Sequence, residues 1–509
     1  MVLGRNLPKE ADVRTGFAQQ PVPTVDWWNV ARVTIDMLPD LALLEIFHFY
    51  VGEERITYEE RIKNVELMNY EEQEQEQINY KEQIDAWHTL VHVCRKWRII
   101  VFGSPRRLGL RLRCSASTPV GGMLDVWPPL PIVILGKYDE KWGVDNLLAA
   151  LEHNDRICQL ELFCVPSSQV EKVLAAMQQP FPDLACMDLK STMMGWTTPI
   201  IPASFLGGSA PRLRALRLNS ISFPGLPKLL LSASHLVYLD LRGIRRSGYI
   251  SPDAMVTGLS VLTRLKILNI GFAFSPGRPD QESRRPQTRT LLPVLTNLWF
   301  SGASEYLEDF VARINAPLLD DLRILFDQVI LNTPQFPEFI SCTPKFKGHD
   351  EVRVIISDVH ISVILPQSSD GTLELAILRS RSDWQVSFLA QICSFSFRQA
   401  LLTVEHLYIQ VRFPSPYGVD DIERSHWLEL LHPYTAVKEL YLPKELVPSI
   451  AHVLQELVGE RVTEVLPALQ ALFLEEPFPL GSVQEAIGQY VAARQLAGYP
   501  ITVSCWKDV

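Results

Sequence analysis

The chain contains few cysteines for its size: eight in 509 residues, with no C-x-x-C pair among them. A secreted domain held by disulfides and a zinc site built from paired cysteines are therefore both disfavoured. The cysteines lie in apolar surroundings such as Leu162-Phe163-Cys164-Val165. This is typical of small buried hydrophobic residues in a reducing compartment.

Long apolar runs are also missing. No stretch of about 18 apolar residues is present, so we expect no membrane-spanning helix. The first residues include Arg5, Lys9 and Glu10 and lack the apolar core of a secretion signal. We therefore expect a soluble protein of the cytoplasm or nucleus, with no membrane partner.

An excess of positive charge is absent as well. The 48 Lys and Arg residues against 58 Asp and Glu give a formal net charge of −10, which excludes a globally basic nucleic-acid binder. Residues 51–85 contain eleven acidic and four basic residues and thus carry −7 of this charge. The segment is too polar to bury, and we interpret it as a solvated acidic insertion.

Residues 95–113 have the opposite character, with seven basic residues and no acidic one. A nucleic-acid contact or a nuclear signal is one interpretation. We favour another, in which arginines alternate with Leu108, Leu110 and Leu112 on an edge strand, because a wider basic footprint is absent.

Motifs of catalysis are not found. The sequence has no G-x-S-x-G, P-loop, G-x-G-x-x-G or H-E-x-x-H motif. His88 and His92 have the spacing of a helical zinc pair, but Thr89 stands where a zincin has Glu, so two surface histidines are favoured. We expect no enzymatic activity, no catalytic residues, no metal and no cofactor.

The N-terminal part predicts an arm followed by two helical segments. Residues 1–33 lack periodicity and suit a flexible arm. At Leu38 a helix signal begins, with Pro39 suited to the first helical position and apolar residues on two sides of the helix that follows. After the insertion an apolar stripe from Trp87 to Val101 predicts an amphipathic helix that ends at Gly103.

From residue 157 onward a short motif recurs: an apolar residue, two variable positions, an apolar residue, one variable position and an apolar residue. Seven copies begin 23 to 30 residues apart, and three more follow a less regular stretch; they start at Ile157, Leu184, Leu213, Leu236, Leu265, Leu295, Leu319, Val404, Val437 and Leu469. Segments able to form helices lie between them. One strand and one return segment per unit predicts an α/β solenoid whose stacked units share a core, in preference to ordinary βα units in a flat sheet.

Leu38-Pro39-Asp40-x-x-Leu43-Leu44-x-Ile46-Phe47, with Trp87-x-x-Leu90-x-x-Val93-Cys94-x-x-Trp97 after the insertion, resembles an F-box. The similarity is to F-box-like proteins abundant in mushroom-forming fungi, and the repeats are similar to divergent leucine-rich repeats. The resemblance divides the chain into an arm (1–33), an F-box-like module (34–113) and a repeat solenoid (114–509).

This resemblance implies a substrate receptor of an SCF-type ubiquitin ligase. The box would bind a Skp-type adapter and through it a cullin, and the repeats would bind a protein substrate. The adapter-binding residues it implies are Leu38, Pro39, Leu43, Leu44, Ile46, Phe47, Val93, Cys94 and Trp97. The box is split by the insertion, and the Asn that usually follows the repeat strand is missing. A repeat protein that binds other proteins without a link to ubiquitin is the alternative.

The variable residue between the last two apolar positions of each motif should point away from the core. This column is charged in its first part and aromatic in its last, which suits a protein-binding face. We predict substrate contacts from Arg217, Asp240, Asn269, Trp299, Arg323, Tyr408 and Tyr441, the other interpretation being ordinary solvated strand residues.

Overall fold

The computed structural model describes residues 35–51, 90–103, 110–114, 116, 120–126, 131–138, 142–192, 198–274, 288–328, 334–357, 360–366, 371–378, 385–412, 423–457, 459–475 and 481–506. The predicted N-terminal arm, His88 and nearly all of the acidic insertion lie outside these residues. The described residues fall into two compact units, one up to Gly103 and one from Leu110, called here the helical unit and the repeat unit.

The helical unit has a short 3-10 turn and two described helical regions. They are η2 (Ile35–Met37), α1 (Asp40–Val51) and, after the insertion, residues 90–93 followed by α4 (Arg95–Gly103). The carbonyl of Pro39 accepts the first helical hydrogen bond, from Leu43 N at 3.0 Å. The apolar stripe predicted as one helix over 87–101 is interrupted at Cys94, and the helix ends at Gly103 as predicted.

The two helical regions bury a small core of their own. Leu43 and Phe47 on α1 are fully buried, and the Phe47 ring lies 4.7 Å from that of Trp97 on α4. Lys96 Nζ donates to the carbonyl of Leu38 at 3.2 Å, which ties α4 to the start of α1. The two-sided apolar pattern of α1 thus supplies one face to this core.

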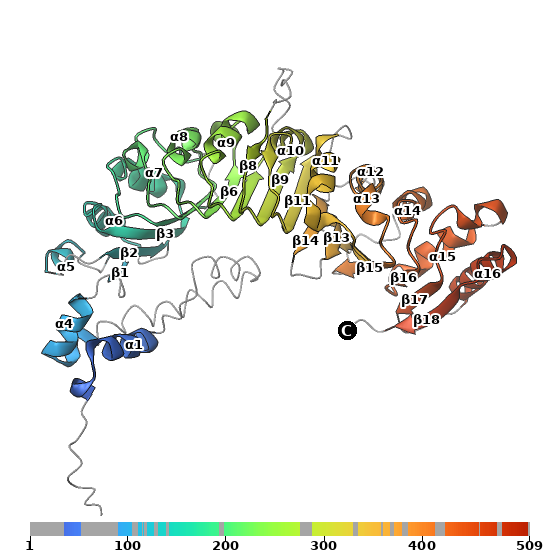
Figure 1. Ribbon diagram of the computed structural model, residues 1–509, viewed down its shortest axis with the longest axis horizontal. Coiled ribbons are helices and arrows are strands. Elements are labelled where there is room, and N and C mark those ends of the chain that lie inside the picture. Colours follow the sequence, from blue (N-terminus) through green and yellow to red (C-terminus); the bar gives the residue numbers. More distant parts are fainter. Residues whose placement is uncertain are drawn as a thin grey trace, which may run out of the picture. The chain divides into compact units, whose positions relative to one another are not determined.

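The repeat unit contains one sixteen-stranded sheet (Figure 1). In spatial order its strands are β1 (Leu110–Arg113), β2 (Ile132–Lys137), β3 (Ile157–Val165), β4 (Cys186–Ser191), β5 (Ala215–Asn219), β6 (Tyr238–Ile244), β7 (Ile267–Phe272), β9 (Asn297–Ala303), β11 (Asp321–Gln328), β14 (Thr372–Leu378), β13 (His360–Pro366), β12 (Glu351–Ser357), β15 (His406–Arg412), β16 (Glu439–Leu442), β17 (Ala471–Glu475) and β18 (Thr502–Trp506). Two short strands, β8 (Thr290–Leu291) and β10 (Ile314–Asn315), pair separately.

All ten predicted motifs lie on strands of this sheet and pair in parallel with their neighbours. In the motif on β5, for example, Leu213 is buried before the strand, and Leu216 and Leu218 are buried on it. The motifs pair in register, so equivalent apolar residues of successive repeats join one continuous core. The fold is α/β with a long, mainly parallel sheet, consistent with an irregular leucine-rich-repeat solenoid.

Helices line one face of the sheet along its length (Figure 1). They are α5 (Val120–Val126), α6 (Val144–Leu151), α7 (Ser167–Ala176), α8 (Leu226–Leu230), α9 (Pro252–Leu259), α10 (Ser304–Val311), α11 (Gln335–Cys342), α12 (Gln385–Ser396), α13 (Arg398–Leu401), α14 (Arg424–Leu431), α15 (Val447–Gln455) and α16 (Ser482–Leu496). Successive helices pack side by side, as α8 does on α9 and α15 on α16. The opposite side of the sheet is called the helix-free face below.

The irregular stretch of the sequence forms an antiparallel meander. β13 pairs antiparallel with both β12 and β14, while β14 pairs in parallel with β11 and β12 with β15. Three strands restore the original direction, so the parallel array continues on the far side of the meander. Its strands lack the repeat spacing because hairpins replace helical returns.

The sheet begins earlier and ends later than the repeat motif. β1 pairs with β2, so residues 110–113 belong to the sheet although we had assigned them to the helical module. The predicted edge strand is confirmed over Leu110–Arg113, and Leu108 lies outside the described residues. Neither β2 nor β18 contains the full motif, so the repeat pattern does not predict these two strands.

Candidate binding surfaces

One column of side chains runs through the repeat unit in strict register. It contains the ten predicted residues between the last two apolar positions of each motif, together with residues of β2, the meander and β18. In spatial order it reads Leu135, Glu161, Asp188, Arg217, Asp240, Asn269, Trp299, Arg323, Glu374, Ile364, Arg353, Tyr408, Tyr441, Phe473 and Ser504. Because side chains alternate along a strand and the flanking leucines enter the core, this column lies on the helix-free face.

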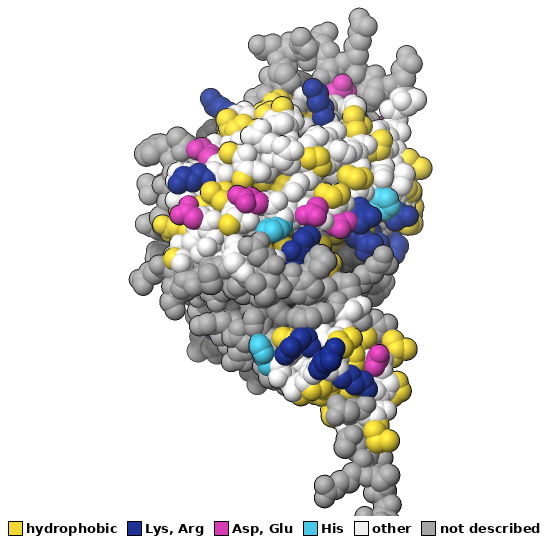
Figure 2. Space-filling model, turned by 90° about the vertical axis from the view of Figure 1, so that its left-hand side faces the viewer, with side chains coloured by type: hydrophobic (Ala, Val, Ile, Leu, Met, Phe, Trp, Pro, Cys, Tyr) yellow, Lys and Arg dark blue, Asp and Glu magenta, His cyan; other side chains and the backbone are white. Residues whose placement is uncertain are grey.

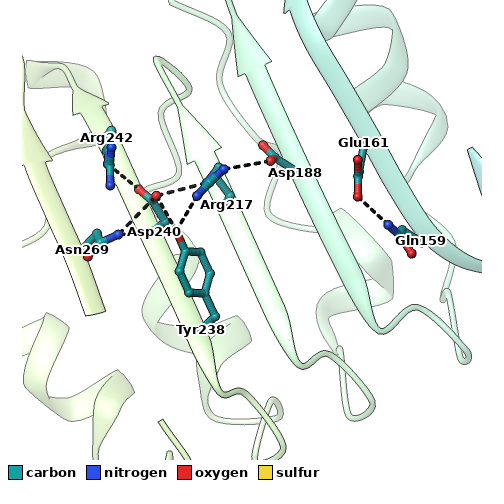
Figure 3. Close-up of polar contacts among 8 residues, drawn as sticks. All are labelled: Gln159, Glu161, Asp188, Arg217, Tyr238, Asp240, Arg242 and Asn269. Carbon is teal, nitrogen blue, oxygen red and sulfur yellow. Dashed lines mark hydrogen bonds and ion pairs between the residues drawn. The ribbon is translucent and has the colours of Figure 1, made fainter. Parts of the chain in front are cut away.

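The first part of the column forms a buried network of charged and polar groups (Figure 3). Arg217 is its centre: its guanidinium donates to Asp240 Oδ2 at 3.1 Å, to Asp188 Oδ2 at 3.4 Å and to the Tyr238 hydroxyl at 2.6 Å. The Tyr238 hydroxyl in turn donates to Asp240 Oδ2 at 2.8 Å. Tyr238 lies two residues before Asp240 on the same strand, so it reaches the network from the neighbouring column.

Asp240 is the most completely surrounded carboxylate of this network. Asn269 Nδ2 donates to its Oδ2 at 3.3 Å, and Arg242 Nε lies 3.1 Å from its Oδ1 as an ion pair. Only 1% of Asp240 and 2% of Asn269 are exposed. Both predicted contact residues are therefore covered by their neighbours, and a direct role in substrate binding stays a prediction for them.

Asp188 has a poorer environment. Its Oδ2 lies 3.4 Å from Arg217, and its buried Oδ1 has no hydrogen-bond partner among the described residues. Burial raises the pKa of Asp188 to about 7, with Arg217 opposing the rise and Glu161 and Asp240 adding to it. Glu161, its neighbour in the column, is also buried and accepts a hydrogen bond from Gln159.

Trp299 and Arg242 form the next part of the helix-free face. The Arg242 guanidinium lies 4.7 Å from the centre of the Trp299 ring, within the range of a cation–π contact. Gly271 makes this possible, because a Cβ added there would lie 2.8 Å from Trp299 Cζ3. Trp299 is half-buried, so part of it faces solvent as predicted.

Arg323 occupies the middle of the column. Its Nε lies 3.1 Å from Asp321 Oδ1, and 39% of its side chain is exposed. Glu374 follows it in register, and burial raises the pKa of Glu374 despite the opposing effect of Arg323. Arg323 is thus the predicted contact residue whose charge is nearest to solvent.

The last part of the column is a stack of aromatic rings. The Tyr408 and Tyr441 rings lie 4.2 Å apart at 13°, and the Tyr441 and Phe473 rings 4.5 Å apart at 6°. Trp506 of β18 meets Tyr441 edge to face at 5.6 Å. Trp506 was not among the predicted residues, because β18 lacks the motif that revealed the other strands.

Polar groups fix the orientation of this aromatic stack. The Tyr441 hydroxyl donates to Glu439 Oε2 at 2.7 Å, and the same oxygen lies 2.9 Å from His406 Nδ1. The hydrogen bond from Tyr441 and the nearby His406 lower the pKa of Glu439. The column thus offers half-buried aromatic groups at one end and a covered ionic network at the other.

The helical unit exposes a second candidate surface, which is apolar. Large apolar side chains on its described residues are exposed to the following fractions: Ile35 45%, Met37 64%, Leu41 65%, Ile46 41%, Val93 54% and Ile99 61%. Figure 2 shows this unit in its lower part, where hydrophobic side chains lie beside those of Lys and Arg. We call these six residues the apolar surface of the helical unit.

The predicted adapter-binding residues divide between the core and the surface of this unit. Leu43, Leu44 and Phe47 are buried, and Leu38, Cys94 and Trp97 are half-buried. Pro39, Ile46 and Val93 are exposed. Ile35, Met37, Leu41 and Ile99 are exposed as well, although none of them is among the predicted adapter-binding residues.

The described residues contain neither a candidate metal site nor a candidate membrane span. No group of three or more His, Cys, Asp or Glu side chains is placed to hold a metal ion within the described ranges. None of the helices resolved in the described part of the chain is long and apolar enough to cross a membrane.

Comparison with known proteins finds a weak structural similarity but no family. No protein-family profile matches the chain, and no curated protein is similar to it. Among solved structures, the leucine-rich repeat-containing protein LegL7 from Legionella pneumophila is similar at 12% identity over 77% of this chain and 98% of that chain, with a TM-score of 0.25. A TM-score this low establishes no shared fold, so the fold assignment depends on the strand register and helix order described above.

Proposed function

We propose that the chain is a non-enzymatic adapter-linked receptor: the helical unit binds a Skp-type adapter of an SCF-type ubiquitin ligase, and the repeat unit binds a protein substrate. The observation that carries the proposal is the apolar surface of the helical unit. A unit with so small a core leaves large apolar groups in water unless a partner covers them. The resemblance of the surrounding sequence to an F-box is the reason for proposing a Skp-type adapter as that partner.

The two sides of α1 differ in burial, which supports a structural role for one side and a binding role for the other. Leu43 and Phe47 are fully buried, and Phe47 packs against Trp97 of α4, whereas Leu41 and Ile46 are 65% and 41% exposed. One helix thus stabilises the unit with one side and offers the other for binding. This matches helix-in-groove recognition, in which apolar anchors of a helix enter a partner.

Binding to a purified Skp-type adapter tests the first half of the proposal. The full chain should bind it, and Leu38→Asp combined with Pro39→Ala, or Leu41→Asp alone, should weaken binding at least ~10-fold, equal to ~1.4 kcal/mol. Leu402→Asp is the matched control, since Leu402 is 54% exposed but belongs to the repeat unit.

Circular dichroism of each variant checks that the fold is kept. Absence of adapter binding, or full retention of it in both the Leu38→Asp, Pro39→Ala variant and the Leu41→Asp variant, would refute the ubiquitin link. The chain would then be a repeat protein that binds other proteins without the ligase.

The substrate half is supported by the helix-free face. Trp299, Arg323, Tyr408 and Tyr441 are partly exposed and lie in one column, so aromatic anchors and a charge are available together. Proximity labelling by the full chain and by an Arg323→Glu, Tyr408→Ser variant tests this. Proteins that are labelled by the wild-type chain but not by the variant are candidate substrates. Identical labelling by both would refute a role of the helix-free face in substrate binding.

A further inference from the structure

The sheet of the repeat unit ends in two strands of different chemistry. β1 has the sequence Leu-Arg-Leu-Arg. Charged residues on an edge strand commonly prevent it from pairing with a strand of another molecule. β18 reads Thr-Val-Ser-Cys-Trp and has neither charge nor proline. Within the described residues, no strand pairs with the outer edge of β18.

The hydrogen-bonding groups of this open edge can be identified from the register. Thr502 N donates to the carbonyl of Gln470 next to β17, at 2.9 Å, and β18 pairs with β17 in parallel. Along a strand, successive residues direct their N–H and C=O groups to opposite sides. Val503 and Cys505 therefore direct their backbone groups toward the open edge.

The helix beside β18, α16, has one exposed charged residue, Glu485 in its first turn. Between Ala486 and Trp506 the sequence has one charged residue, Arg494, and it is fully buried, donating to the carbonyls of Val462 and Leu469. Beyond Glu485 the exposed residues of α16 are Gly488, Gln489, Ala492, Gln495 and Leu496. Leu496 is 90% exposed, and Tyr499, just after the helix, is 52% exposed. The exposed surface of this terminal repeat between Ala486 and Trp506 is therefore uncharged, and its polar groups include the neutral amides of Gln489 and Gln495.

We propose that β18 is a self-association edge, at which two copies of the chain pair antiparallel and join their sheets across a two-fold axis. We choose a second copy of the chain as the partner because a two-fold symmetric contact brings each residue near its own counterpart or a close neighbour. An uncharged strand pairs with its own copy without charge repulsion, whereas the sequence of β1 contains two positive charges, which disfavour such pairing.

The outward groups fix the register of this pairing. Val503 opposes Cys505 of the second copy in both hydrogen-bonded pairs, and the axis passes through the non-hydrogen-bonded pair of Ser504 with Ser504 of the second copy. The axis is perpendicular to the sheet, so both copies keep their helices on the same face. α16 then comes beside α16 of the second copy, as it does beside α15 within one chain.

Charge reversal at the axis tests the proposal on the full chain. Sedimentation of the wild type should show a concentration-dependent dimer. Ser504→Lys and Ser504→Glu should each raise the dimer dissociation constant at least ~10-fold, because like charges meet at the axis. An equimolar mixture of the two variants should restore the dimer. Ser504 is exposed, so neither change disturbs the core.

Disulfide trapping tests the register itself. In a Cys505→Ser background, Ser504→Cys should form an intermolecular disulfide, since Cα atoms of such a pair lie about 4.5 Å apart, within the disulfide range. The matched control is Thr502→Cys, which opposes Trp506 and lies about 13 Å from its own counterpart. It should not crosslink.

A monomer at all concentrations overturns the proposal, and so does equal crosslinking of the two cysteine variants. Fast hydrogen exchange at the amides of Val503 and Cys505 in that monomer would show a bare edge. Slow exchange there would show that another segment of the same chain covers it. Adapter binding is measured in a separate assay, so failure of the proposed ubiquitin link would not change the sedimentation and crosslinking results.

Discussion

Asp188 and Asp240 lie two strands apart and share one arginine, yet their environments differ. Asp240 accepts hydrogen bonds from Arg217, Tyr238 and Asn269, which compensate for its burial. Asp188 has a single long contact with Arg217 and an oxygen without a partner among the described residues. Burial of a carboxylate without sufficient donors favours its protonated form. The pKa of about 7 at Asp188 follows from this difference.

This pKa predicts a pH dependence of stability. The unfolded carboxyl titrates near pH 4 and the folded one near 7, so the folded chain holds an extra proton between these values. The contribution of Asp188 to stability is therefore largest below the unfolded pKa, falls as the pH rises through this window and levels off above the folded pKa. From pH 5.5 to 7.0 the loss is at most ~2 kcal/mol.

Asp188→Asn should remove this part of the pH dependence, since the amide does not ionise. Urea unfolding of the wild type and the variant at pH 5.5 and 7.5 measures it. Asp183→Asn is a control, because Asp183 is an exposed partner of Arg212. An unchanged difference between the two pH values in Asp188→Asn would contradict the assignment.

Among the elements, β18 shows how an edge strand is held by a side chain. The Trp506 side chain reaches past β17 to β16 and β15. Its ring lies 5.6 Å from that of Tyr441 and 6.4 Å from that of Tyr408, and its Nε1 donates to Leu442 O at 3.3 Å. Contacts of this kind add to the backbone pairing of β18 with β17. The attachment of the strand therefore depends on its last described residue.

Trp506→Ala should loosen β18. We expect a loss of ~2 kcal/mol, below the cost of removing a fully buried tryptophan because Trp506 is half-buried, and faster hydrogen exchange in β17 and β18. Trp142→Ala is the matched control: Trp142 lies against Gly136 on β2, so exchange there should rise while β18 stays protected. Equal exchange of β18 in wild type and Trp506→Ala would refute the contribution of the indole.

The repeat strands could be predicted from sequence because each buries three apolar residues at fixed spacing. The meander and β18 could not, since hairpins and an edge strand obey no such spacing. The missing Asn is also explained: Ile221 and Ile244 at its position are buried, and backbone bonds such as Ala273 N to Ile244 O hold the turn. In the site, the spacing predicted the column but not which members are covered, because Tyr238 and Arg242 come from the columns on either side of it.

At the scale of the whole molecule, the two units have separate cores. Leu43 and Phe47 belong to the helical unit, and the continuous cluster of the repeat unit begins at Leu112. A small core supports little stability by itself, whereas stacked repeats share theirs. Adapter binding and repeat stability should consequently respond to different substitutions.

Paired core substitutions in the full chain test this separation. Phe47→Ala should unfold the helical unit and abolish adapter binding, because it removes the ring against Trp97, while the main thermal transition of the repeats stays in place. Leu440→Ala, in a fully buried residue of β16, should lower repeat stability by ~2–5 kcal/mol and leave adapter binding intact. Calorimetry with a binding assay below the transition distinguishes the outcomes. A single transition shifted equally by both variants would mean that the units fold as one, and adapter binding could then be lost through either of them.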